Sequence, residues 1–149
     1  MDASFIYGLI AFSATALAWA SGDHVRQKLG LLLQGVWATT AIAVTYMGFE
    51  RAPALFPYVH TVAFLIVAWL GFRNRSYVAL VVFVIYGSLA VTDLVAIILR
   101  EQGTYTYYAT VNVLFVAQLL TVGGSSAWLA IRNWADRGDQ RRGLVRARR

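Results

Sequence analysis

The chain of 149 residues has no cysteine and only one lysine among its 13 basic residues. Without cysteine it can form no disulfide, no thiolate zinc site and no iron–sulfur cluster. Charge is also scarce, at 13% of residues, where a soluble domain has about 25%. Hydrophobic residues reach 59%, against about 45–50% in a soluble domain. This balance argues against an ordinary water-soluble protein and predicts a chain that folds in lipid.

Five apolar stretches each approach the length of about 20 residues that a helix needs to cross a bilayer. They cover residues 5–20, 31–49, 55–72, 77–99 and 107–131. We therefore predict an all-α fold, an integral membrane helical bundle of five transmembrane helices. Residues 1–131 would form this single domain and residues 132–149 a basic cytoplasmic tail. The first stretch follows Asp2 instead of the basic residues of a signal peptide, so we expect it to be a retained span.

The basic residues predict how the bundle is oriented. With five spans, eleven of them fall on one side: two in the first link, two in the third and seven after residue 131. Arg51 and Arg100 fall on the other side, each next to a glutamate. Because cytoplasmic loops carry the excess of Lys and Arg, the N-terminus should be outside and the C-terminus in the cytoplasm. The preference for arginine over lysine is typical of a GC-rich genome, and we expect a bacterial inner (plasma) membrane protein.

Aromatic residues are expected at the two edges of the membrane, where their amphipathic rings are favoured. Three tryptophans fall near the cytoplasmic ends of the first, third and fifth spans: Trp19, Trp69 and Trp128. Three tyrosines fall near the outer end of the fifth span: Tyr105, Tyr107 and Tyr108. The pattern predicts that these six side chains form aromatic belts.

Stripes of small residues predict where helices touch, because helices in lipid associate by close packing. One stripe follows the first span and another the second, at the three- and four-residue spacing of one helical face. A pair of glycines in the fifth span predicts a close crossing or a kink. The residues are Gly8, Ala11 and Thr15; Ala38, Ala41 and Thr45; and Gly123 and Gly124. The pattern is compatible with contacts within one chain or between chains.

Asp93 is an acidic residue inside the apolar fourth span. A carboxylate in the bilayer costs several kcal/mol, so such residues usually face the bundle interior or water. Asp93 lies about six residues, or about 9 Å, before the outer end of its span. His60 has a similar depth in the third span, and the short link makes the two spans neighbours. We predict a polar cluster, open to the outside, that contains Asp93, His60, Asn112, Tyr86 and Tyr46.

Three interpretations of Asp93 follow from the sequence, and the sequence does not decide between them. Asp93 can belong to an ion or proton path or a ligand site, with His60 as a partner whose charge changes near neutral pH. It can be a polar clamp that fixes the register of the helices. It can also pair with Arg100, seven residues later, or reach the interface, and have little role.

Motifs of catalysis are absent from the sequence. There is no HExxH, GxSxG, paired-carboxylate or phosphate-loop motif. His24 and His60 fall on opposite sides of the predicted membrane, which excludes a bis-histidine haem site. We expect no catalytic residue, no metal and no cofactor, and therefore no enzyme.

The basic tail predicts contact with anionic lipid at the cytoplasmic face. Nucleic acid is not expected as a partner, because Trp134 is the only aromatic residue of the tail. The arginines assigned to the lipid contact are Arg137, Arg141, Arg142, Arg146, Arg148 and Arg149.

In size, span number and basic tail the chain is similar to small phage or bacterial membrane proteins, including holin-like pore formers. Our first hypothesis is a small membrane protein that self-assembles and forms a pore or an ion or proton path. The alternative is a non-catalytic accessory subunit of a larger membrane complex, because almost no soluble surface is available and partners must meet the chain within the bilayer. A subunit that binds a pigment or haem through His60 is the third and weakest hypothesis.

Overall fold

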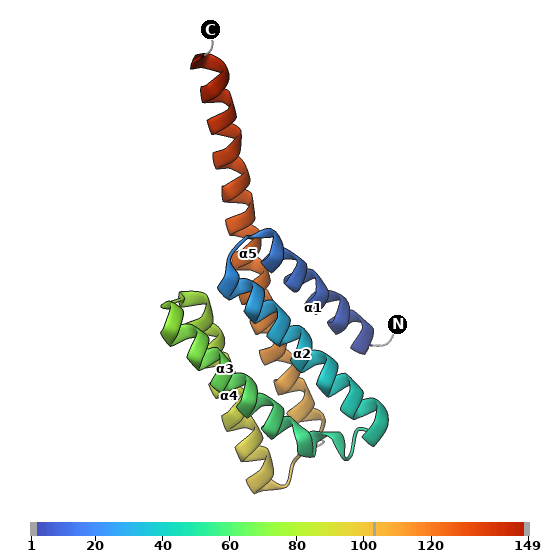
Figure 1. Ribbon diagram of the computed structural model, residues 1–149. Coiled ribbons are helices and arrows are strands. Elements are labelled where there is room, and N and C mark those ends of the chain that lie inside the picture. Colours follow the sequence, from blue (N-terminus) through green and yellow to red (C-terminus); the bar gives the residue numbers. More distant parts are fainter. Residues whose placement is uncertain (1–2, 103, 148–149) are drawn as a thin grey trace.

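The computed structural model describes residues 3–102 and 104–147, with side-chain environments for residues 6–102 and 104–137. The described chain is helical apart from short links (Figure 1). Its elements are α1 (Ala3–Ala20), α2 (His24–Met47), the short 3-10 helix η1 (Ala52–Leu55), α3 (Phe56–Asn74), α4 (Tyr77–Leu99) and α5 (Tyr105–Ala147). The predicted all-α class is confirmed.

Four segments are long and apolar enough to cross a membrane: His24–Met47, Ala52–Asn74, Tyr77–Leu99 and Tyr105–Arg137. α1 adds a shorter apolar helix over Ile6–Ala20. These lengths are those of a multi-pass membrane protein. The crossing by α1 and the orientation of the bundle stay predictions.

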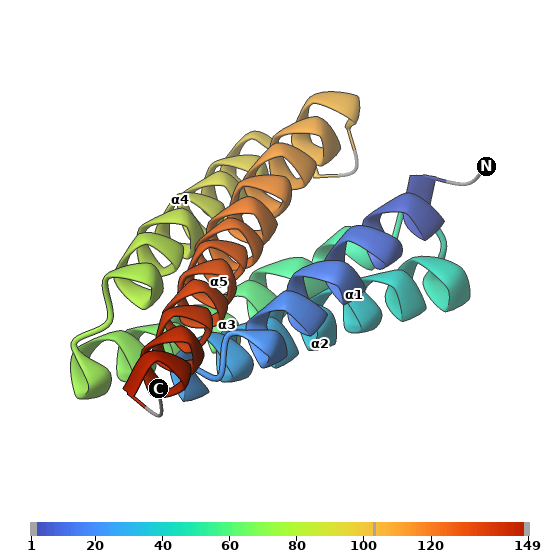
Figure 2. The same ribbon diagram turned by 90° about the horizontal axis from the view of Figure 1, so that it is seen from above.

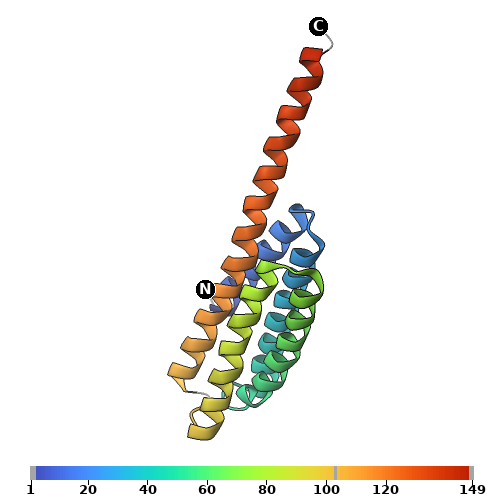
Figure 3. The ribbon, with the colours of Figure 1, turned by 90° about the vertical axis from the view of Figure 1, so that its left-hand side faces the viewer.

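Successive helices alternate in direction, so their links gather at two ends of the bundle (Figure 1). We call the end with the α1–α2 and α3–α4 links the tail end, because α5 extends from it toward the C-terminus (Figure 3). The opposite end, with the α2–α3 and α4–α5 links, is called the far end. α3 packs on α4, α1 packs on α2 and α5, and α4 packs on α5.

Two helix boundaries differ from the prediction. α2 begins at His24 and not near residue 31, because the Asp23 side chain caps it by accepting bonds from the N–H groups of Val25 and Arg26. Arg26 and Lys28 therefore lie within the helix and not in a link. The last helix does not stop at residue 131, because the polar residues that follow continue it to Ala147.

The predicted tail is thus the helical extension of α5 as far as the structure describes it. Arg137 is exposed there, as a lipid-contacting residue must be. Arg141, Arg142 and Arg146 lie in the helix, but their side chains are outside the described part. Arg148 and Arg149 lie outside the described residues altogether.

The tail-end half of the bundle has an apolar core in which large aliphatic side chains are at most 2% exposed. They are Leu29, Leu33, Val67, Leu70, Val82, Leu119 and Val122. Because lipid tails are as apolar as these side chains, the core holds the helices together mainly through close van der Waals contact. It also leaves little room for water in this half of the bundle.

α1 makes close contacts with both of its neighbours through small residues. A Cβ at Gly8 would lie 2.5 Å from the ring of Trp37, and the Thr15 hydroxyl donates across the interface to the Gly30 carbonyl at 3.0 Å. Ala11 is fully buried. On the other side, a Cβ at Gly123 would lie 3.3 Å from the Ala14 Cβ. The first stripe and Gly123 thus lie at helix contacts within one chain.

The other predicted packing residues do not lie at contacts of this kind. Gly124 is exposed and has open space around it, because it faces away from α1. On α2, Thr45 is exposed, and Ala38 and Ala41 are only half-buried. The buried face of α2 is a different one, formed by Leu29, Gly30, Leu33 and Val36.

Candidate functional site

Asp93 is held by two side chains from two other helices. It lies on the buried face of α4 and is 2% exposed. Its Oδ2 is 2.8 Å from Nδ1 of His60 on α3. Its Oδ1 accepts a 2.7 Å hydrogen bond from the hydroxyl of Tyr107 on α5. We call these three residues the Asp93 triad.

Local structure explains why His60 meets Asp93. Arg75 takes a left-handed conformation directly after α3, and Ser76 caps α4 by accepting from the Ala79 N–H. This tight link sets α3 and α4 side by side and antiparallel. His60 lies four residues after α3 begins and Asp93 six residues before α4 ends, so the two side chains have the same depth near the far end.

Tyr107 is the member of the triad that the sequence analysis missed. We expected it in an aromatic belt, but it is 4% exposed, whereas Tyr105 is 89% exposed. Phe56 stacks on Tyr107 with a centroid distance of 6.4 Å and also lies beside His60. The signal available in the sequence was spacing, because Tyr107 lies four residues before Val111 and so shares a face of the helix with it, and Val111 packs against the core.

Two predictions about the cluster are wrong. Tyr46 is 85% exposed and lies outside the cluster, because the end of α2 turns it outward. Arg100 is exposed at the C-cap of α4, and both Asp93 oxygens are bonded to other residues, so Arg100 is not the partner of Asp93. Asp93 is also too buried to reach the interface.

The other predicted members line a cavity beside the triad. This cavity has a volume of about 210 Å³ and is walled largely by aromatic and aliphatic side chains, to which all five helices contribute. Its polar lining includes His60, Tyr86, Asn112 and Gln118. Asp93 is not part of the lining and lies behind His60. Because Nδ1 of His60 is bonded to Asp93, Nε2 is the ring nitrogen available to the cavity.

The cavity occupies the far-end half of the bundle. Its lining on α5 runs from Tyr108 to Gln118, which is about 15 Å along a helix. That length is about half of the roughly 30 Å hydrocarbon core of a bilayer. Beyond Gln118 the bundle is filled by the apolar core of the tail-end half. The cavity therefore ends near the middle of the bundle.

Three buried polar atoms at the inner part of this cavity have no hydrogen-bond partner within the described part of the chain. They are the Tyr86 hydroxyl and the nitrogen and oxygen of the Gln118 side-chain amide. Tyr86 and Gln118 are both 0% exposed. A buried polar group left without a partner costs about 1–3 kcal/mol.

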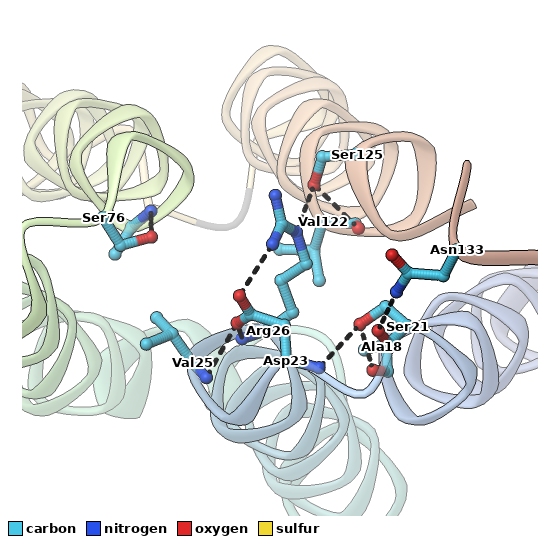
Figure 4. A network of polar contacts seen from close by, with 10 residues as sticks. Ala18, Ser21, Asp23, Val25, Arg26, Ser76, Val122, Ser125 and Asn133 are labelled. Carbon is cyan, nitrogen blue, oxygen red and sulfur yellow. Dashed lines mark hydrogen bonds and ion pairs between the residues drawn. The ribbon is translucent and has the colours of Figure 1, made fainter. Parts of the chain in front are cut away.

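A second polar network closes the tail end, and Figure 4 shows it. The side chain of Arg26, on α2, reaches α5. Its Nη1 is 2.9 Å from Asp23 Oδ2, and its Nε donates to the Ser125 hydroxyl at 3.4 Å. Asn133 of α5 donates to the Ser21 carbonyl at 3.2 Å. These contacts tie the α1–α2 link to α5. We assign these contacts a structural role.

Comparisons with protein-family models, curated proteins and solved structures found no match to this chain. Among the described residues, no three His, Asp or Glu side chains come together as metal ligands would. What the triad can do chemically is hold and pass a proton. A carboxylate, an imidazole and a phenol are in direct hydrogen-bond contact, and the imidazole also reaches the cavity.

Proposed function

We propose that this chain is a membrane protein with an intramembrane proton-binding centre, and that the Asp93 triad forms part of an ion or proton path. The observation that carries the proposal is the position of His60, which contacts Asp93 through Nδ1 and also lines the cavity. Histidine with such a pair of contacts acts as a proton shuttle in many proteins. The path would run from the cavity through His60 to Asp93.

The chemistry of the pair supports this role. With Asp93 ionised and the His60 proton on Nδ1, the pair carries one negative charge and Nε2 can accept a proton. Binding of a proton at Nε2 from the cavity, with transfer of the Nδ1 proton to Asp93, leaves a neutral acid beside a neutral imidazole, which costs less to bury than a charge. Tyr107 holds the carboxylate in place by donating to its other oxygen. The same residues thus fix the register of three helices and offer a site for a proton.

The shape of the bundle gives the path a direction. By the positive-inside rule the tail end faces the cytoplasm and the far end faces outside, which would place the cavity in the outer half of a bacterial plasma membrane. The apolar core of the tail-end half separates the cavity from the cytoplasm. A complete path therefore requires a movement of the helices. The arginines of α5 would contact anionic lipid at the cytoplasmic surface.

The outer surface favours a path inside the bundle over a holin-like pore between copies. A pore between copies needs polar groups on the outer faces of its helices. Most of the exposed Ser and Thr hydroxyls on the described helices instead donate to carbonyls of their own helix, four residues earlier. They include Ser13, Thr39, Thr45, Ser88 and Thr110. Such hydroxyls are compatible with lipid, and self-assembly through these faces would bring apolar surfaces together.

An accessory subunit of a larger membrane complex is the second candidate. A groove of about 460 Å³ runs between α2 and α3, lined mainly by apolar residues and by Gly35. Gly35 is exposed and has open space around it. A groove with a small residue in its floor fits a helix of a partner subunit. Native mass spectrometry of the protein extracted from its own membrane separates the two cases, because an accessory subunit would carry other chains in fixed ratio.

Proton transfer can be measured with the purified protein in liposomes that contain a pH-sensitive dye. We expect a step in external pH to reach the interior at least ten times faster with the wild type than with Asp93→Asn. Asn keeps the size of the side chain and can still accept from Tyr107, so the fold should survive. Asp136→Asn, at an exposed position on α5, is the matched control and should behave as wild type. Equal rates for wild type and Asp93→Asn would refute the proton path.

A further inference from the structure

The inner end of the cavity has buried hydrogen-bonding groups that suit a ligand. More than nine in ten buried polar groups in proteins have a hydrogen-bond partner. Here a phenol and a primary amide, on α4 and α5, both lack one although they line the same cavity. Neither Tyr86 nor Gln118 belongs to the Asp93 triad. An inert core would be more stable with Phe and Leu at these positions, because the same space would be filled without unpaired polar atoms.

The walls around these groups indicate the chemistry of the ligand. Trp37, Phe56 and Phe115 present aromatic rings to the cavity. The lining includes no Lys, Arg, Asp or Glu, so a charged ligand would find no counter-charge. Flat rings stack favourably on aromatic walls. Donors at the inner end, the Tyr86 O–H and the Gln118 amide N–H, are suited to oxygen acceptors.

We propose that the cavity binds a neutral, lipid-soluble, planar ring compound that carries hydrogen-bonding oxygens, the chemistry of a quinone headgroup. Tyr86 and Gln118 would donate to a carbonyl oxygen of the ring. The Gln118 amide oxygen could accept from a hydroxyl, so the reduced form of such a compound would also find a partner. The site is one of binding only, and it does not depend on proton transfer by Asp93.

The arrangement of the helices gives such a molecule a route from the membrane. α1 and α5 cross closely at Ala14 and Gly123 and diverge toward their N-termini (Figure 2). Tyr7 of α1 lines the cavity on this side and is only half-buried. A ring on a hydrophobic chain could enter between the two helices and leave its chain in the lipid.

Tryptophan fluorescence offers a direct test, because Trp37 is the only one of the five tryptophans in the lining of this cavity. Trp19, Trp69, Trp128 and Trp134 are all more than half exposed. The probe is a benzoquinone with a short alkyl chain, added to the protein in lipid nanodiscs. We expect saturable quenching in the wild type, and loss of the saturable part in Trp37→Phe. Quenching that rises with quinone concentration without saturation would show partition into lipid only, and would overturn the proposal.

Two substitutions test the polar contacts. Tyr86→Phe and Gln118→Leu together should weaken binding at least tenfold, while Tyr77→Phe, at an exposed position of α4, should leave it unchanged. An alkylbenzene with the same chain and no oxygens should compete at least tenfold more weakly than the quinone. Equal affinity of the double variant, or equal competition by the alkylbenzene, would contradict the proposed contacts.

Thermal unfolding separates a ligand-binding role from a structural one. Gln118→Leu removes an unpaired buried amide, so without quinone the variant should unfold at a higher temperature than wild type. Addition of quinone should stabilise the wild type and have a smaller effect on the variant. A lower melting temperature for Gln118→Leu without quinone would show that the amide supports the fold, and would count against the binding site.

Discussion

At the scale of single residues, the Asp93 triad shows how a carboxyl group is accommodated in an apolar bundle. Each Asp93 oxygen has its own hydrogen-bond partner, and the two partners come from α3 and α5. Hydrogen bonds to charged groups contribute more than bonds between neutral groups, about 1.5–3 kcal/mol each. The triad therefore links three helices at one point, and its removal should weaken the packing of all three.

Tyr107→Phe isolates one of these bonds. The substitution removes a single hydroxyl and keeps the ring that stacks on Phe56. We expect it to destabilise the protein by about 1–3 kcal/mol, because it leaves a buried carboxylate oxygen without a donor. Tyr105→Phe, two residues earlier and exposed, should change stability by less than about 0.5 kcal/mol. Unfolding in mixed micelles measures both, and equal stabilities for the two variants would mean that the bond contributes nothing.

The sequence allowed part of this site to be predicted. His60 and Asp93 could be placed together because a short link joins their helices and their depths follow from counting residues. Depth does not reveal which way a helix is rotated about its axis. Tyr46 and Tyr107 were therefore misplaced in opposite senses, one assigned to the cluster and the other to the membrane edge. Their burial depends on packing against helices far away in the sequence.

At the scale of elements, the crossing of α1 and α5 depends on one glycine of an adjacent pair. Gly123 faces Ala14, whereas Gly124 faces open space. The helix continues through both, so the pair marks a close crossing and not an end of the helix. Two neighbouring residues of the same type thus have different roles because they are about 100° apart around the helix.

The same substitution at these two positions should give opposite results. Gly123→Leu forces a side chain against Ala14 and should destabilise the protein by about 1–3 kcal/mol. A Cβ at Gly124 would meet nothing within 4 Å, so Gly124→Leu should stabilise the protein by up to about 1 kcal/mol, because leucine favours the helix more than glycine does. Melting temperatures of both variants in the same detergent check this. Similar destabilisation by both would mean that the crossing is not where the structure places it.

Helix existence was easier to predict from the sequence than helix extent. The apolar runs identified the five α-helices of the described chain, since a membrane crossing needs a long uninterrupted apolar segment. The ends were set by other forces. Asp23 caps α2 eight residues before its apolar run begins, and polar residues carry α5 well past its own run. Hydropathy does not report caps or the continuation of a helix into water.

At the scale of the whole molecule, the two halves of the bundle differ in what fills them. The far-end half holds the cavity and the Asp93 triad, and the tail-end half holds the apolar core. Arg26, Lys28, Arg73, Arg75 and the arginines of α5 are all at the tail end or beyond it. The apolar core therefore lies in the half of the bundle next to the basic residues, and the cavity lies in the other half. In a bilayer the two halves would be close to opposite surfaces of the membrane.

The orientation can be tested cleanly because the chain has no cysteine of its own. Ala54→Cys at the far end and Ala135→Cys beyond the tail end are matched, exposed positions, and they leave all 13 basic residues in place. In intact cells an impermeant maleimide should label Ala54→Cys, and it should label Ala135→Cys only after the membrane is opened. The reverse pattern would invert the orientation. Labelling of both without permeabilisation would rule out the three crossings between them.

The same reagent decides whether α1 crosses the membrane. α1 is the shortest of the apolar helices, and the predicted position of the N-terminus depends on its crossing, because an even number of crossings would put both termini on one side. Ser4→Cys stands at the start of α1 and Ala20→Cys at its end. We expect labelling at residue 4 in intact cells and at residue 20 only after permeabilisation. If both positions behave as Ala135→Cys does, α1 lies on the cytoplasmic side without crossing, and the bundle has four spans.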